Sequence, residues 1–166
     1  MELRSKMLSE RMPVVRFEFS ETDPVQDLDH IGLTDAEIVE LVSSRHAMGY
    51  WRSDLASGHV FWSKGVFDIY GMEFTRGPVN LTAAYGNVHA EDLNLMLELI
   101  ERAASEKTGF HYVLRLKNGE NGVKYVRSVG RCRATSDGRE ELIGIVEEII
   151  DQVRLVGVLG NPPMAI

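Results

Sequence analysis

The last third of the chain constrains the fold most, because three strand-like segments there are joined by short turns. In the first segment, at 110–116, one face carries only apolar residues, namely Phe110, Tyr112, Leu114 and Leu116. Turn signals at Gly119 and Gly138 separate it from segments at 124–134 and 142–150. Strands joined by such short turns pair antiparallel. The pattern therefore predicts an antiparallel sheet with one buried face.

The segment after Met48 predicts a hairpin and a short helix. Residues 49–55 and 59–62 read as two short strands, because the residues between them favour a turn. A helix is predicted at 63–71, where the hydroxyl of Ser63 can cap the first turn and Gly71 can end the last one. We interpret the stretch that follows as irregular.

A longer helix is predicted to begin near Glu91. Its apolar residues recur at helical spacing, as Leu93, Leu97, Ile100 and Ala104. Combined with the strands, this predicts an α+β domain at 46–150. We expect a five-stranded antiparallel sheet whose helices pack on one face.

An amphipathic helix is predicted ahead of this domain, at 33–48. Thr34 and Glu37 have the spacing of a capping box at its start. Its apolar stripe consists of Ile38, Leu41, Val42 and Met48. A stripe of this kind must be buried, either against the domain that follows or against a second copy of the helix, and the sequence leaves both open.

Composition limits the kinds of partner that we expect. The balance of 44% hydrophobic and 26% charged residues is that of an ordinary globular protein, so 166 residues predict one domain with extensions at 1–30 and 151–166. A short strand is possible at 15–19 in the first extension. The net charge of −7 disfavours nucleic-acid binding, which needs a basic surface. No apolar run is long enough for a leader or a membrane span, so we expect a cytoplasmic protein without membrane contact.

Cysteine and histidine usage gives no indication of a metal site. Cys132 is the only cysteine, which excludes an internal disulfide. The five histidines show no ligand spacing. Three arginines at alternating positions of one strand, Arg127, Arg131 and Arg133, are interpreted as a solvated sheet face.

Several short motifs occur in an order that resembles the PAS domains of bacterial sensor kinases and cyclic-dinucleotide enzymes. The opening hairpin of that subgroup is matched by Gly49, Trp51, Asp54, Gly58, Trp62 and Ser63. Its first helix resembles 67–71, and its His-Pro-Glu-Asp motif resembles 89–92, where Ala90 replaces the proline. Its closing strands are matched by Phe110, Arg115, Gly130 and Gly144. The usual closing Asp-Ile-Thr is here Glu148-Ile149-Ile150.

The resemblance implies a sensor or adaptor rather than an enzyme. Such modules commonly pair through helices and through the outer sheet face, so we expect a homodimer whose interface includes Ile38, Leu41, Val42 and Met48. Because the chain ends at Ile166, the output is expected on a separate signalling protein such as a histidine kinase. A small apolar ligand is possible in the core, and its candidate lining is Tyr70, Met96, Ile100, Leu114, Val126 and Cys132.

No flavin, haem or metal is expected in this core. Covalent flavin chemistry needs a cysteine ahead of the long helix, whereas Cys132 lies on a late strand and is interpreted as a small apolar filler. Haem ligation would use a histidine on the long helix, and 91–106 contains none. His89 precedes that helix, where we expect it to bond backbone. Trp51 and Trp62 are interpreted as packing anchors.

Two alternatives remain open. One is a purely structural dimerisation module with a filled core. The other is a small α+β-cone isomerase or dehydratase, for which Asp54, Asp68 or His111 would be the buried acid or base. The order of strands and helices disfavours it. We interpret the Glu91 and Asp92 pair as the solvated first turn of a helix rather than as a catalytic pair.

Overall fold

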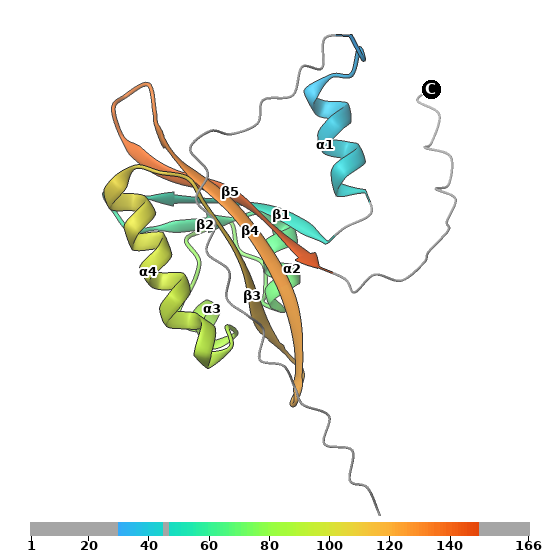
Figure 1. Cartoon of the computed structure of the whole chain (residues 1–166), viewed down its shortest axis with the longest axis vertical. Coiled ribbons are helices and arrows are strands. Elements are labelled where there is room, and N and C mark those ends of the chain that lie inside the picture. The colour runs from blue at the N-terminus through green and yellow to red at the C-terminus, as the bar shows by residue number, and fades with distance from the viewer. Residues whose placement is uncertain (1–29, 45–46, 150–166) are drawn as a thin grey trace, which may run out of the picture. The chain divides into compact units, whose positions relative to one another are not determined.

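The computed structural model describes residues 30–44 and 47–149 of the chain. Within them the elements follow the order of one helix, two strands, three helices and three strands (Figure 1). Their bounds are α1 (Asp35–Ser43), β1 (Met48–Asp54), β2 (Val60–Trp62), α2 (Lys64–Tyr70), α3 (Leu81–Gly86), α4 (Ala90–Glu106), β3 (Phe110–Asn118), β4 (Gly122–Ala134) and β5 (Glu140–Ile149).

The strands form one antiparallel sheet in the order β2-β1-β5-β4-β3. The three strands predicted from the last third of the sequence form a meander, in which β4 pairs with both β3 and β5. β5 then pairs with β1, and β1 pairs with β2 at the sheet edge. The predicted fold class is confirmed, with α4 running along one face of the sheet (Figure 1).

The ends of α2 and α4 follow from local chemistry. Ser63 occupies the position before α2 and was expected to cap that helix. Its hydroxyl does not do so, because it accepts a hydrogen bond from the Tyr50 N–H at 2.9 Å. The hydroxyl ties the helix start to β1 instead. Gly71 ends α2 at a φ of 64°, a conformation that glycine adopts without strain. At α4, His89 Nδ1 accepts the Glu91 N–H at 3.3 Å, as predicted.

The interpretation of the stretch after Gly71 as irregular is wrong over six residues, because α3 forms there. Asn80 begins this helix by accepting the Ala83 N–H at 3.1 Å. Ala84 is buried against Phe67 and Val79 beneath the helix. One and a half turns are too short to reveal a helical period in the sequence.

The helix ahead of the domain is shorter than predicted. It was expected over 33–48, but α1 ends at Ser43 and Met48 is the first residue of β1. Met48 therefore belongs to the sheet and not to the helix stripe. Most of the extension at 1–30, including the possible strand at 15–19, lies outside the described residues, as does the tail at 151–166.

The core lies between the inner face of the sheet and α2, α3 and α4. Its largest cluster joins Val66, Ile69 and Tyr70 of α2, Met96 of α4, and Leu114, Leu116, Val126 and Val146 of the sheet, with Val88 beside them. The face predicted for β3 is confirmed, because its inward residues Leu114 and Leu116 are buried. Within the described ranges no helix is long and apolar enough to cross a membrane.

Candidate functional site

The structure brings five of the six predicted pocket residues together. Tyr70, Met96, Leu114 and Val126 belong to the main buried cluster, and Ile100 packs against it. Cys132 packs against a neighbouring cluster of Ala103, Phe110 and Leu142, and Ile100 packs against that cluster as well. The six residues are therefore divided between two adjoining clusters.

Two glycines of the sheet, Gly130 of β4 and Gly144 of β5, are covered by Trp51. Across the inner face, Trp51 of β1 pairs with Gly144 of β5, which pairs with Gly130 of β4, which pairs with Phe110 of β3. A Cβ placed on Gly130 would lie 2.7 Å from Trp51 Cζ2, and one on Gly144 would lie 2.6 Å from the same atom. The indole ring therefore lies directly over both glycines.

Polar partners fix the orientation of this indole. Trp51 Nε1 donates to Ser128 Oγ at 3.2 Å and lies 3.4 Å from the Ile145 carbonyl oxygen. Ser128, which is 0% exposed, donates its own hydroxyl to the same carbonyl at 2.8 Å. The ring of Phe110 lies beyond the indole, with 5.8 Å between the ring centroids. Trp51 is thus held by both packing and hydrogen bonds.

Two tyrosines extend this polar line toward α2. Burial raises the pKa of Tyr70 well above its ordinary value, and the interaction with Tyr112 raises it further. Burial also raises the pKa of Tyr112, although its hydrogen bonds with Ser128 and Tyr70 oppose the shift. Both phenols are therefore neutral at physiological pH. Within the described residues, every buried side-chain nitrogen and oxygen has a hydrogen-bond partner.

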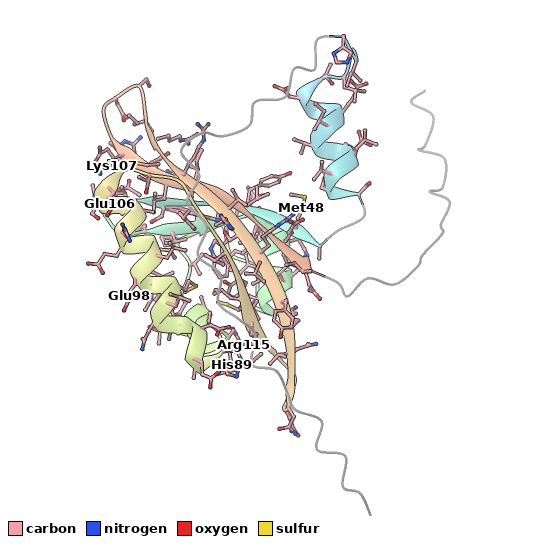
Figure 2. All side chains as sticks on the ribbon, in the orientation of Figure 1. Met48, His89, Glu98, Glu106, Lys107 and Arg115 are labelled. Carbon is pink, nitrogen blue, oxygen red and sulfur yellow. The ribbon has the colours of Figure 1, made fainter. Side chains whose placement is uncertain are left out.

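Glu91 and Asp92 do not form an isolated acid pair, because Arg115 of β3 binds both. Asp92 accepts the Arg115 backbone N–H at 2.9 Å and Nε at 3.0 Å, and Glu91 Oε2 lies 3.0 Å from Nη2. Burial raises the pKa of Asp92, but hydrogen bonds with Arg115 outweigh it and hold the value below the ordinary one. The His89 N–H also donates to the Arg115 carbonyl. These bonds to Arg115 join the start of α4 to β3, and Figure 2 labels His89 and Arg115.

The three residues considered for a cone-type enzyme lie on separate elements. Asp54, at the end of β1, accepts the N–H groups of Ala56 and Ser57 at 2.9 Å and so holds the first hairpin turn. Asp68 is exposed on α2 and forms an ion pair with Lys64. His111 is exposed on β3. None of these positions gives an acid in an apolar cavity.

The outer face of the sheet carries an apolar surface that sequence reasoning did not assign residue by residue. We define the outer patch as Tyr50, Val113, Tyr125, Val129, Ile145 and Ile149. All of these except Ile145, which is half-buried, are exposed. Tyr50 pairs with Ile145, and Ile145 with Val129, so the patch continues across three strands. The signal for it was the strand alternation itself, because these residues lie between the inward ones.

Arginines surround the outer patch, as expected for a solvated face. Arg52 and Arg133 share the carboxylate of Glu141, at 2.8 Å each, and Glu141 is only 2% exposed. Hydrogen bonds from Arg52 and then from Arg133 lower the pKa of Glu141. Arg127 forms an ion pair with Glu147, and Arg131 is exposed. Two guanidinium groups on one carboxylate leave this end of the face with net positive charge.

The helix α1 is exposed and acidic, in contrast to the arginine-flanked outer patch. None of its nine residues, all within the described chain, is buried, and Leu41 is 59% exposed. Of the predicted interface residues, Ile38, Leu41 and Val42 lie on it at helical spacing. The same helix carries three acidic residues, Asp35, Glu37 and Glu40, and no basic ones.

Two shallow hollows lie on the described surface. One of about 460 Å³ is lined by Leu55, Ala56, Glu101, Ala104, Ser105, Lys107 and Glu140. A smaller one of about 220 Å³ is lined by Ile69, Tyr70, Gly71, Asn87, Lys117, Asn118, Gly119 and Lys124. Of the predicted pocket residues, only Tyr70 contributes to either. No group of three or more potential metal ligands occurs among the described residues.

No protein-family model and no curated protein matches the sequence. Among solved structures, an RNA-binding light-oxygen-voltage receptor superposes with a TM-score of 0.56 and 14% identity, over 66% of this chain and 31% of the receptor. A sensory box histidine kinase/response regulator from Burkholderia thailandensis superposes with a TM-score of 0.53 and 15% identity, over 68% of this chain and 85% of that chain. The N-terminal domain of a diguanylate cyclase with PAS/PAC sensor from Marinobacter aquaeolei superposes with a TM-score of 0.51 and 12% identity, over 61% of this chain and 94% of that domain. This chain thus spans about a third of the receptor.

Proposed function

The described chain carries a PAS-type domain, and we propose that it is a signalling module that acts by protein contact, as a homodimer that engages a separate output protein. One observation carries this proposal. The chain exposes two apolar surfaces of opposite charge, the acidic helix α1 and the arginine-flanked outer patch. Soluble monomers tend to avoid large exposed apolar patches, so each surface calls for a partner.

The two surfaces are chemically complementary. Ile38, Leu41 and Val42 would pack on the outer patch of a second copy, while the α1 carboxylates face arginines such as Arg127 and Arg131. Complementary charges of this kind mainly set the orientation and speed of association, whereas apolar burial supplies most of the affinity. A symmetric pair forms two such contacts, since each copy has both surfaces.

An output partner would use the same surfaces. Solved structures with this fold include a domain named as a sensory box histidine kinase, and such a kinase is our proposed class of partner for this chain. The partner would exchange with the second copy on α1 or on the outer patch. Signal transfer then requires only that two packings of α1 differ by a few kcal/mol, so that a contact can shift their populations.

The interior supports a module that functions without a bound cofactor. Trp51 covers the two inward glycines, and four of the predicted pocket residues are buried in the main cluster. This packing favours contact over ligand binding as the input. It also keeps a purely structural dimerisation role as the second candidate, which differs only in having no output partner.

The test is the oligomeric state of matched variants at micromolar concentration. Leu41→Glu places a charge on the apolar stripe, whereas Ala36→Glu adds the same charge on an exposed position of the same helix away from it. We expect a dimer for the unmodified protein and for Ala36→Glu, and a folded monomer for Leu41→Glu by light scattering and circular dichroism. A monomeric unmodified protein refutes the proposal. So does a dimer that survives Leu41→Glu.

A further inference from the structure

Glu141 is a buried carboxylate on the outer face of the sheet. Its side chain is 2% exposed, although Arg133, its register partner on the same face, is exposed. The cover comes from Arg133 and from Arg52 of β1, whose guanidinium groups both donate to it. A carboxylate that is buried in this way gains little net stability from its ion pairs, because it loses its hydration. Stability alone therefore does not explain the arrangement.

The carboxylate fixes the position of two guanidinium groups. Arg52 Nη1 donates to Oε1 at 2.8 Å, and Arg133 donates to Oε2 from Nε at 3.0 Å and from Nη2 at 2.8 Å. The Arg52 guanidinium also lies 4.6 Å from the centre of the Phe61 ring. A guanidinium has five N–H donors, so both groups keep donors that these bonds do not use. Two sets of donors are thus oriented before any ligand binds.

Arg131 adds a third guanidinium to this corner of the sheet. It lies exposed on the outer face of β4, and only Ile143 separates it from Arg52 in the register. Three guanidinium groups around one carboxylate leave two positive charges unbalanced. The carboxylate of Asp54, on the same face, is engaged elsewhere, since it accepts the backbone N–H groups of its own turn and lies 3.9 Å from Arg139.

We propose that Arg52, Arg131 and Arg133 form a binding site for a phosphate group, which we call the arginine corner. A phosphate monoester carries nearly two negative charges at neutral pH and accepts several hydrogen bonds. These properties match the two unbalanced charges and the unused guanidinium donors, which suit the oxygens of a phosphate in paired bonds. A carboxylate ligand would bring only one charge.

The open position of the arginine corner favours a phosphate that a protein presents. Its three arginines lie on the outer face of the sheet, and none of them lines either of the two hollows described above. Small-molecule sites are concave and enclose most of their ligand, whereas a phosphorylated side chain brings its own protein surface to the contact. The occupant is therefore a phosphorylated side chain of a partner protein. This goes beyond the proposed function and does not depend on the dimer.

Three probes at neutral pH test the site and the source of the phosphate. They are inorganic phosphate, a short peptide with a central phosphoserine, and the same peptide without phosphate. We expect the NMR signals of the Arg52, Arg131 and Arg133 Nε–H groups to shift with the first two probes and not with the third. The phosphopeptide should bind at least as tightly as inorganic phosphate, because phosphoserine, with a second pKa of about 6, is the more fully charged of the two.

Matched variants locate the binding. Arg131→Gln removes one guanidinium and leaves both ion pairs of Glu141 in place, so the fold should persist. Phosphate should bind this variant about tenfold more weakly, the equivalent of one charge-assisted hydrogen bond. Arg127→Gln is the control, because Arg127 pairs with Glu147 and lies four residues along the same strand, roughly 13 Å away. The screening length is about 8 Å at physiological salt, so this change should alter the affinity by less than about twofold.

The variant Leu41→Glu separates this site from the proposed dimer. The arginine corner lies within one copy, so Leu41→Glu should bind phosphate no more weakly than the unmodified protein does, whether or not a dimer forms. Weaker binding would mean that the site needs a second copy, which overturns the proposal.

Three further results overturn it. The first is the absence of shifts at the three arginines with millimolar phosphate. The second is an equal loss of affinity in Arg131→Gln and Arg127→Gln, which would reduce the effect to a diffuse attraction by the whole face. The third is a phosphopeptide that binds more weakly than inorganic phosphate, or no better than the unphosphorylated peptide, because the occupant would then not be a phosphorylated side chain.

Discussion

Replacing Gly130 with alanine would place a methyl group 2.7 Å from Trp51 Cζ2 and 2.8 Å from two ring carbons of Phe110. Such distances require at least one ring to move, and overpacking of this kind costs about 1–3 kcal/mol of unfolding free energy. Trp51→Ala alone should cost about 3–5 kcal/mol. If the methyl group and the indole compete for one space, the double variant should be more stable than the sum of the two single effects predicts.

The expected coupling is about 1–2 kcal/mol in favour of the double variant, within the range measured for residues in contact. Urea unfolding followed by circular dichroism supplies all four free energies of the cycle. Gly144→Ala is the matched control, because its Cβ would lie 2.2 Å from the Val129 carbonyl oxygen. That clash is with backbone and should persist when the indole is removed. Additivity of Gly130→Ala and Trp51→Ala within about 0.5 kcal/mol would refute the placement of the ring.

Three further outcomes follow from the titrating groups. Asp92→Asn should lower the unfolding free energy by about 1.5–3 kcal/mol at neutral pH. Because the folded-state pKa of Asp92 is depressed, the difference in unfolding free energy between the variant and the unmodified protein, measured by urea unfolding, should shrink below pH about 4. Glu141→Gln leaves Arg52 and Arg133 facing each other without a carboxylate, so its thermal midpoint should rise with added salt more than that of the unmodified protein. Tyr70 has a raised pKa, so the stability it contributes is present below pH about 10 and is lost above it, and Tyr70→Phe should flatten that alkaline decline.

The strand meander was predictable because its alternation and its turns agree. Phe110, Tyr112, Leu114 and Leu116 recur on one face, and both connections contain a glycine at positive φ, Gly119 in the first and Gly138 in the second. The helix α3 was not predictable, since six residues show no period. The end of α1 was misplaced for a related reason. Met48 fits the helical spacing of the stripe, and only the backbone assigns it to β1.

The filling of the inner face was beyond sequence reasoning for a different reason. The small residues of β4 were visible in the sequence, and so was Trp51, but nothing local connects them. Their meeting depends on the register that places Trp51 opposite Gly144 and Gly144 opposite Gly130, and β1 is far from β4 and β5 in the chain. Side-chain alternation gives the face of each residue, whereas register decides which residues share a level.

The residues beneath the Trp51 indole and much of the outer patch lie on the same two strands, β4 and β5, so a change in packing on one face also affects the other. On β4, the inward residues Ser128 and Gly130 flank Val129, which faces outward. On β5, Ile145 contributes to both faces, because its carbonyl lies beside the Trp51 N–H while its side chain belongs to the outer patch. A shift of the indole that moved this carbonyl would also tilt the Ile145 side chain between Tyr50 and Val129. A single residue, Ile145, therefore connects the core to the proposed contact surface.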